Sequence, residues 1–268
     1  MEYVELPPPP GLRHLVHCFW FLRSDHPVSR PQPVVPDGRP ELIVHLGEPF
    51  ARLERDGRWR PQARVLVAGQ LLAPIALQPA GPAEVCGIRF TTAGAGNLFP
   101  SLPELTGAVE PLVAVNPRLA ARLWDAAQAS SGRRARVAAM ARVLAAFEGD
   151  RAEPTVPCAV SALDAPDAPP VQVLARSLGL TTRTLERRVL RATGLSPVAL
   201  RSVCRFRRAF HLLRGAPPGH WGRVAADSGY ADQSHMNRAF RRFAGTSPAR
   251  FLSGQADLAL AFASQGSA

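Results

Sequence analysis

The sequence predicts an α+β chain of two domains. The first, over residues 1–150, is expected to be a β-rich domain with trailing helices, and the second, over residues 151–268, is expected to be all-helical. Before about residue 112, apolar runs have the length of strands and are bounded by Pro and Gly. From about residue 118, apolar residues recur at helical spacing instead. A length of 268 residues also suits two domains.

The first part contains five strand-length apolar runs, at residues 15–22, 41–46, 64–68, 74–78 and 85–90. The pairs Asp37-Gly38 and Asp56-Gly57 indicate tight turns between such runs. Short strands joined by tight turns are typical of antiparallel sheets. We therefore expect an antiparallel β-barrel or sandwich.

Two helices are expected after the strands, separated by Gly132. Their apolar stripes are Leu119, Leu123 and Ala126 in the first, and Val137, Met140, Leu144 and Phe147 in the second. A stripe of this kind packs on its own domain or forms a dimer surface, and packing on its own domain is the favoured alternative. Residues 149–170 hold five prolines and predict a connection between the domains, with one short helix near residues 156–163.

The last third contains one helical pattern twice. Ala175, Gly179 and Leu180 recur 50 positions later as Ala225, Gly229 and Tyr230. After one inserted residue, a second set recurs 51 positions later: Leu185, Arg187, Val189, Gly194, Ser196 and Pro197 become Met236, Arg238, Phe240, Gly245, Ser247 and Pro248. Each copy has the pattern of a short helix, a Gly-containing turn and a second helix that begins with polar residues. This is the pattern of a helix-turn-helix.

Several local signals set the limits of these helices. Thr181 and Asp232 are the expected N-caps of the two second helices, and Gly179 supplies the turn of the first copy. A helical stripe between the copies, made of Leu200, Val203, Phe206, Phe210 and Leu213, predicts a long linking helix that fixes their spacing. Trp221, Val224 and Ala225 begin the scaffold helix of the second copy.

The positive charge of the chain gathers on the repeated segment. Residues 1–170 carry 17 Arg and 17 acidic residues, whereas residues 171–252 carry 15 Arg and only three acidic residues. A basic segment of this kind is expected where a protein meets the phosphates of nucleic acid. The sequence contains no run of about 18 apolar residues, so it predicts no membrane span. The acidic, Pro-rich start does not resemble a signal peptide. The four cysteines, Cys18, Cys86, Cys158 and Cys204, are scattered, so we expect free core thiols in the cytoplasm.

Residues 171–252 resemble the AraC/XylS family of bacterial transcription regulators. The resemblance lies in residues 180–189 (LTTRTLERRV), 194–197 (GLSP), 205–209 (RFRRA), 229–235 (GYADQSH), 238–243 (RAFRRF) and 245–248 (GTSP). One departure is Val189, where the family more often has Phe. The first part is similar to the N-terminal domain of a subset of this family, through residues 36–38 (PDG), 41–44 (ELIV), 87–90 (GIRF) and Gly94. That resemblance implies a cupin-like β-barrel for sensing or dimerisation.

Base reading is expected from the first turns of the two recognition helices, because side chains there reach the floor of the major groove. The candidate DNA-binding residues are Thr182, Arg183, Glu186 and Arg187 in the first copy, and Gln233, Ser234, Asn237 and Arg238 in the second. Arg pairs with guanine, Glu accepts from cytosine, and Gln and Asn suit adenine, so the second half-site is expected to be richer in A·T. Arg191, Arg201, Arg241 and Arg242 are expected to neutralise phosphates or to lie on the plain surface.

Enzyme functions receive less support. A metal-dependent cupin enzyme needs clustered ligands, and the first part offers only the separate His14, His17, His26 and His45. A DNA-repair methyltransferase of the Ada-like branch needs a zinc-binding Cys cluster, which the four separated cysteines do not supply. No nucleophile elbow, Walker loop or dinucleotide fingerprint occurs. We therefore expect no enzyme, no metal and no cofactor.

The sequence as a whole predicts a cytoplasmic transcription regulator that binds double-stranded DNA at two adjacent major-groove segments and is modulated through its first domain. RNA polymerase, a small-molecule effector and a second copy of the chain are the further partners that this function allows. Two alternatives stay open: a metal-binding or catalytic barrel that carries a DNA-targeting module, and an architectural DNA-binding protein without an effector.

Overall fold

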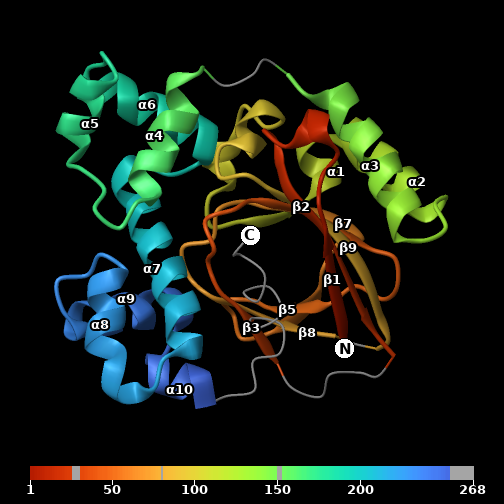
Figure 1. Ribbon diagram of the computed structural model, residues 1–268. Helices are drawn as coiled ribbons and strands as arrows, with labels where there is room; N and C mark the ends of the chain where they lie inside the picture. The colour runs from red at the N-terminus through yellow and green to blue at the C-terminus, as the bar shows by residue number, and fades with distance from the viewer. Residues whose placement is uncertain (26–30, 80, 150–152, 254–268) are drawn as a thin grey trace.

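The computed structural model describes residues 1–25, 31–79, 81–149 and 153–253. Figure 1 shows the strands on one side of the molecule and the helices of the last third on the other, with α7 running along the boundary between them. Two further helices, α2 and α3, cover the N-terminal strands from the opposite side.

The N-terminal strands form two antiparallel sheets. One has the order β1-β2-β9-β4-β7-β10, made of Glu2–Leu6, Val16–Ser24, Ala83–Phe90, Glu41–His45, Val65–Ala68 and Val109–Pro111. The other has the order β3-β8-β5-β6, made of Gln32–Val34, Ile75–Gln78, Ala51–Leu53 and Trp59–Pro61. Side chains such as Trp20, Phe50 and Leu77 are buried between the two sheets.

All five predicted runs form strands, namely β2, β4, β7, β8 and β9. The closed barrel is not formed, so within the described residues the open two-sheet alternative is the correct one. The strands of the second sheet have only three or four residues each, and among the described residues they pair with one another and not with the first sheet. The Asp56-Gly57 turn joins β5 and β6, and Gly57 takes a left-handed φ of 77°. The Asp37-Gly38 turn instead carries the chain from the second sheet to the first.

The expected helices after the strands are α2 (Pro117–Gln128) and α3 (Arg133–Phe147), preceded by the short α1 (Leu112–Val115). Leu119 and Leu123 of α2 are buried in the core of their own domain, as are Val137, Met140 and Leu144 of α3. The sulfur atoms of Cys86 in β9 and Met140 lie 4.0 Å apart. These stripes therefore pack on their own sheet, the alternative favoured over a dimer surface. Single 3-10 turns are η1 (Pro10–Leu12), η2 (Gly94–Asn97) and η3 (Leu102–Leu105).

The last third is helical, as predicted. Its elements are α4 (Thr155–Asp164), α5 (Val171–Ser177), α6 (Thr182–Thr193), α7 (Pro197–Gly215), η4 (Pro218–His220), α8 (Trp221–Asp227), α9 (Gln233–Ala244) and α10 (Pro248–Ser253). They share a hydrophobic core to which the expected stripe of α7 contributes Leu200, Val203, Phe206, Phe210 and Leu213. Helix α4, from the predicted connection, adds Ala159 and Leu163 to this core.

Three of the four cysteines are buried free thiols, but Cys158 is exposed, so the expectation of a core thiol is wrong there. Helix α4 buries Val156, Ala159 and Leu163, which lie on one helical face, and Cys158 falls outside that face.

In the parts of the chain that the structure describes, every helix is too short or too polar to cross a bilayer.

Candidate nucleic-acid interface

The two copies of the repeat fold into two matching helix-turn-helix modules, α5 with α6 and α8 with α9. The buried residues of α6 are Leu185, Val189, Ala192 and Thr193, and those of α9 are Met236, Phe240, Phe243 and Ala244. Each buried residue of α9 therefore stands 51 positions after one of α6, the period seen in the sequence. Both recognition helices turn the same face to the core, so they expose the same face to solvent.

Local capping fixes where each recognition helix begins and ends. The Thr181 hydroxyl accepts a hydrogen bond from the Thr184 backbone N–H at 3.1 Å, and the Asp232 carboxylate accepts one from the His235 N–H at 2.6 Å. Both predicted N-caps are thus confirmed. Both helices end at a glycine with a left-handed φ, 77° at Gly194 and 73° at Gly245, which side chains larger than hydrogen rarely adopt.

The predicted base-reading residues fall in the first two turns of the two helices. In α6, Arg183, Glu186 and Arg187 are exposed and Thr182 is half-buried. In α9, Gln233, Ser234 and Arg238 are exposed, and Asn237 is half-buried. The Asn237 Oδ1 is buried and lacks a hydrogen-bond partner among the described residues, so bidentate pairing with a base requires its amide to rotate.

The arginines of the helical domain divide into two groups. One group makes contacts inside the protein: Arg188 pairs with Glu153, Arg205 binds the Gly229 carbonyl oxygen, and Arg207 and Arg208 contact Asp164. The other group is exposed and includes the base-reading candidates together with Arg191, Arg241 and Arg242. Arg201, the remaining candidate for phosphate contact, is half-buried. Part of the excess charge is therefore structural, and the rest faces solvent on and around α6 and α9.

The first module is supported from outside by the N-terminal domain. Its buried face has no aromatic ring, whereas Phe240 and Phe243 of the second module both lie 5.1 Å from the Phe206 ring, centroid to centroid. The end of α6 instead packs on η2 and η3. A Cβ at Gly96 would lie 2.7 Å from the backbone of Ala192, so only glycine allows this approach.

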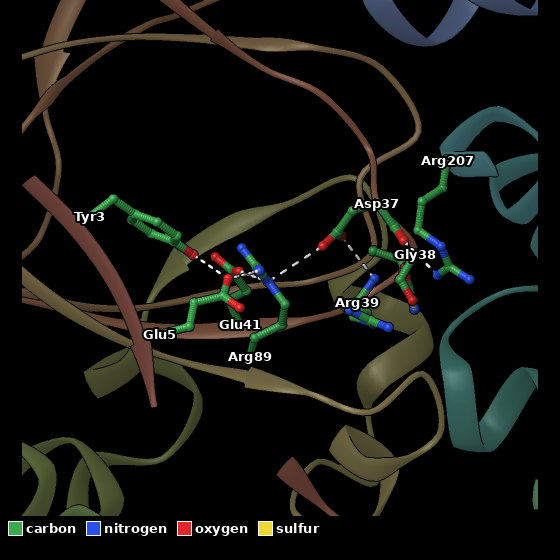
Figure 2. Close-up of polar contacts among 9 residues, drawn as sticks. Tyr3, Glu5, Asp37, Gly38, Arg39, Glu41, Arg89 and Arg207 are labelled. Carbon is green, nitrogen blue, oxygen red and sulfur yellow. Dashed lines mark hydrogen bonds and ion pairs between the residues drawn. The ribbon is translucent and has the colours of Figure 1, made fainter. Parts of the chain in front are cut away.

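A buried cluster of charged side chains joins the two N-terminal motifs that carry the resemblance (Figure 2). The Arg89 guanidinium donates to Glu41 at 2.7 Å and to Glu5 at 2.9 Å, and lies 3.5 Å from the Asp37 carboxylate. Burial raises the pKa of Glu41 to about 7, although the positive charge of Arg89 lowers it. The Asp37 carbonyl oxygen in turn accepts a hydrogen bond from Arg207 of α7 at 2.9 Å. The sequence analysis did not predict this cluster, although the charged residues within two apolar runs could have indicated it.

A cavity of about 100 Å³ lies between the two sheets and α7. Its wall is mostly apolar, and its polar lining includes Asp37, Arg39, Glu41 and Arg89 from the N-terminal domain and Arg207 and His211 from α7. Burial is the largest influence on His211 and lowers its pKa, and the charges of Arg207, Arg214 and Arg39 lower it further. The cavity can hold a small molecule in contact with both domains.

The candidate metal ligands lie apart from one another. His14 pairs with Glu148, His17 is half-buried near Arg39, and His45 lines the cavity beside Phe50. Burial lowers the pKa of both His17 and His45 to about 4, so both are neutral at pH 7. His26 lies outside the described residues. Within the described residues, no three His, Cys, Asp or Glu side chains come together as a metal site requires.

Comparisons with known proteins add independent information. Residues 174–254 match the model of a helix-turn-helix domain family, and residues 4–109 match the model of a domain of unknown function, DUF6597. No curated protein sequence matches the chain significantly.

Solved structures that are similar to this chain include the following three. The C-terminal domain of AraT, a response regulator from Geobacillus stearothermophilus, is 25% identical over 38% of this chain and 87% of its own, with a TM-score of 0.34. The DNA-binding domain of AdpA, in complex with a target DNA, is 27% identical over 42% of this chain and 95% of its own, with a TM-score of 0.32. ToxT from Vibrio cholerae with a bound unsaturated fatty acid is 11% identical over 87% of this chain and 94% of its own, with a TM-score of 0.48.

The family match covers the segment in which the structure shows two capped recognition helices on one scaffold. Residues 174–254 therefore form a helix-turn-helix domain of the AraC type, and the chain is a DNA-binding transcription regulator that carries this domain behind an N-terminal domain of unknown function.

Proposed function

We propose that this regulator reads two adjacent major-groove segments of duplex DNA, one with α6 and one with α9. The observation that carries the proposal is the matched exposure of the two helices, which present polar first turns on equivalent faces. No hydrogen bond or ion pair engages Arg183, Arg187 or Arg238 within the described part of the chain, so these guanidinium groups are free to bind bases.

The proposed base-reading residues are Thr182, Arg183, Glu186 and Arg187 in α6, and Gln233, Ser234, Asn237 and Arg238 in α9. Arginine pairs bidentately with guanine, and Gln or Asn with adenine, so the two half-sites should differ in composition. Helix α7 separates the modules and, with 19 residues, is about 28 Å long. This length is of the same order as the roughly 34 Å between groove segments one helical turn apart.

The test selects duplexes from a random-sequence pool with the full-length protein and then measures binding of variants by gel shift. Arg187→Ala should weaken binding to the selected duplex by about 1–3 kcal/mol and relax the preference at one base pair. Arg223→Ala is the matched control, because Arg223 lies exposed on the scaffold helix α8. An equal loss by Arg187→Ala on selected and random duplexes would contradict base reading by α6.

We further propose that a small molecule in the cavity modulates DNA binding. The cavity touches both domains, so a ligand in it can bind different arrangements of the two domains with unequal affinity. A ligand shifts the equilibrium between two arrangements only through such a difference in affinity. Its volume of about 100 Å³ is several times the roughly 10–15 Å³ that one water needs. Thermal-shift screening of small metabolites tests this role. If the protein is instead an architectural DNA-binding protein, the screen will find no small molecule that both binds the protein and changes its affinity for DNA.

The remaining assignments are predictions from the sequence and the helix-turn-helix domain. They are the division into domains 1–150 and 151–268, action in the cytoplasm, a homodimer, and contact with RNA polymerase. Limited proteolysis within residues 149–170 tests the division, and sedimentation of the free protein tests the dimer.

A further inference from the structure

The segment that follows α4 lies directly against the turn of the second helix-turn-helix module. Gly229 in that turn has a left-handed φ of 82°, and a Cβ there would lie 2.5 Å from the Pro166 carbonyl oxygen. The turn and the segment thus approach more closely than any residue other than glycine at position 229 would allow. The connection between the domains is therefore also a support for the second module.

Asp164, the last residue of α4, contacts two neighbouring arginines of α7. Its carboxylate accepts a hydrogen bond from Arg207 at 2.5 Å and another from Arg208 at 3.5 Å, and its carbonyl oxygen also accepts from Arg208. The side chains of Arg207 and Arg208 are only 15% and 21% exposed. Charge-assisted bonds in such partly buried places are stronger than surface ion pairs.

The two arginines reach in different directions from Asp164. Arg207 donates to the Asp37 carbonyl oxygen in the N-terminal domain at 2.9 Å, as Figure 2 shows. Arg208 donates to the Ser228 carbonyl oxygen in the turn of the second module at 3.1 Å. Adjacent residues of a helix point about 100° apart, so the contacts that Arg207 and Arg208 make beyond Asp164 lie in different directions.

We propose that Asp164 is a positioning residue that fixes the second recognition helix relative to the first and to the N-terminal domain, and thereby sets the half-site spacing that the protein accepts. The first module is held at η2 and η3 by Gly96 and by the bond from Thr106 to the Gly194 carbonyl oxygen at 2.6 Å. The second module is held through Asp164, Arg208 and the Ser228-Gly229 turn. This inference rests on the proposed reading of two groove segments.

The experiment compares three duplexes made from the sequence that the full-length wild type selects. The first is the intact duplex, the second has its α9 half-site scrambled, and a third series carries one to five base pairs inserted between the half-sites. Asp164→Asn keeps the shape of the side chain and removes its charge. Asp167→Asn is the matched control, because Asp167 is exposed in the same segment.

We expect Asp164→Asn to bind the intact duplex about tenfold more weakly than the wild type, and the scrambled duplex equally well. Its affinity should also depend less on inserted base pairs, because a loosely held second module tolerates more spacings. Loss of fold alone would lower the affinity for every duplex and would leave the spacing profile unchanged. An equal loss on the intact and scrambled duplexes, or a spacing profile like that of the wild type, overturns the inference.

Arg208→Gln keeps the Asp164 pair with Arg207 and removes the bond to Ser228, so it repeats the test if Asp164→Asn does not fold. A wild type that selects no two-part sequence refutes the proposed function itself. A wild type that selects one, with both variants keeping its spacing profile, refutes only the role of Asp164.

Discussion

The buried cluster around Arg89 offers a test of how the N-terminal domain is held together. The Arg89 side chain is 4% exposed and lies 2.7 to 3.5 Å from the carboxylates of Glu5, Asp37 and Glu41. Arg89→Met keeps most of the side-chain volume and removes the positive charge. Three carboxylates then stand in a largely buried place with their shared cation gone.

The expected loss is about 3–5 kcal/mol near pH 7.5, the usual cost when one partner of a buried ion pair is removed. For a protein of this size, that lowers Tm by roughly 6–20 °C. The loss should depend on pH. Because the folded pKa of Glu41 is raised from 4.5 to about 7, Glu41 holds its proton more tightly in the folded state. Its contribution to stability is present below pH 4.5 and falls as pH rises toward 7.

Removing the charge of Arg89 raises the folded pKa of Glu41 further, so this fall should extend above pH 7 in the variant. The assay is urea unfolding of wild type and variant at pH 5 and pH 8, with Arg23→Met as control. Arg23 lies on the neighbouring strand β2 and is 66% exposed, so its replacement should cost under about 1 kcal/mol. A variant as stable as wild type, or a deficit that does not grow from pH 5 to pH 8, would refute the reasoning.

Two further predictions concern the DNA surface and the contact between domains. Affinity for DNA should fall steeply as the salt concentration rises. Arg241→Ala should lower the slope of log K against log[salt] by about 1, because Arg241 is exposed and is expected to neutralise a phosphate. A flat salt titration would contradict DNA binding through this surface. Gly96→Ala should force α6 away from η2, since its Cβ would lie 2.7 Å from the backbone of Ala192. Faster proteolysis within residues 149–170 is expected, whereas Gly11→Ala, with no atom within 4 Å of its Cβ, should behave as wild type.

The helical domain was largely predictable because its signals are local. An N-cap side chain bonds an N–H three residues away, as Thr181 and Asp232 do, and a left-handed glycine ends its own helix, as Gly194 and Gly245 do. Both signals act within one turn, so they can be recognised without knowledge of the rest of the fold. The exposure of Arg183, Arg187 and Arg238 follows from the same helical period.

The N-terminal strands were predictable only where the sequence carries an apolar run of strand length. The strands β3, β5, β6 and β10 have three residues each, and β1 is partly exposed with mixed polarity. Segments this short have little periodicity of their own and become strands because a neighbour pairs with them. The same reason made a closed barrel and two open sheets hard to separate from the sequence.

By itself, the sequence determined the two helix-turn-helix modules, their caps and the residues that their exposed faces present. Only the tertiary structure decided which charges are structural: Arg207 reaches Asp37 across 170 positions, and Arg89 reaches Glu5 across 84. Capping and helical period act between near neighbours in the chain, whereas ion pairs and cavities depend on how distant segments are brought together. No local pattern specifies that arrangement, because it arises from the packing of the whole core.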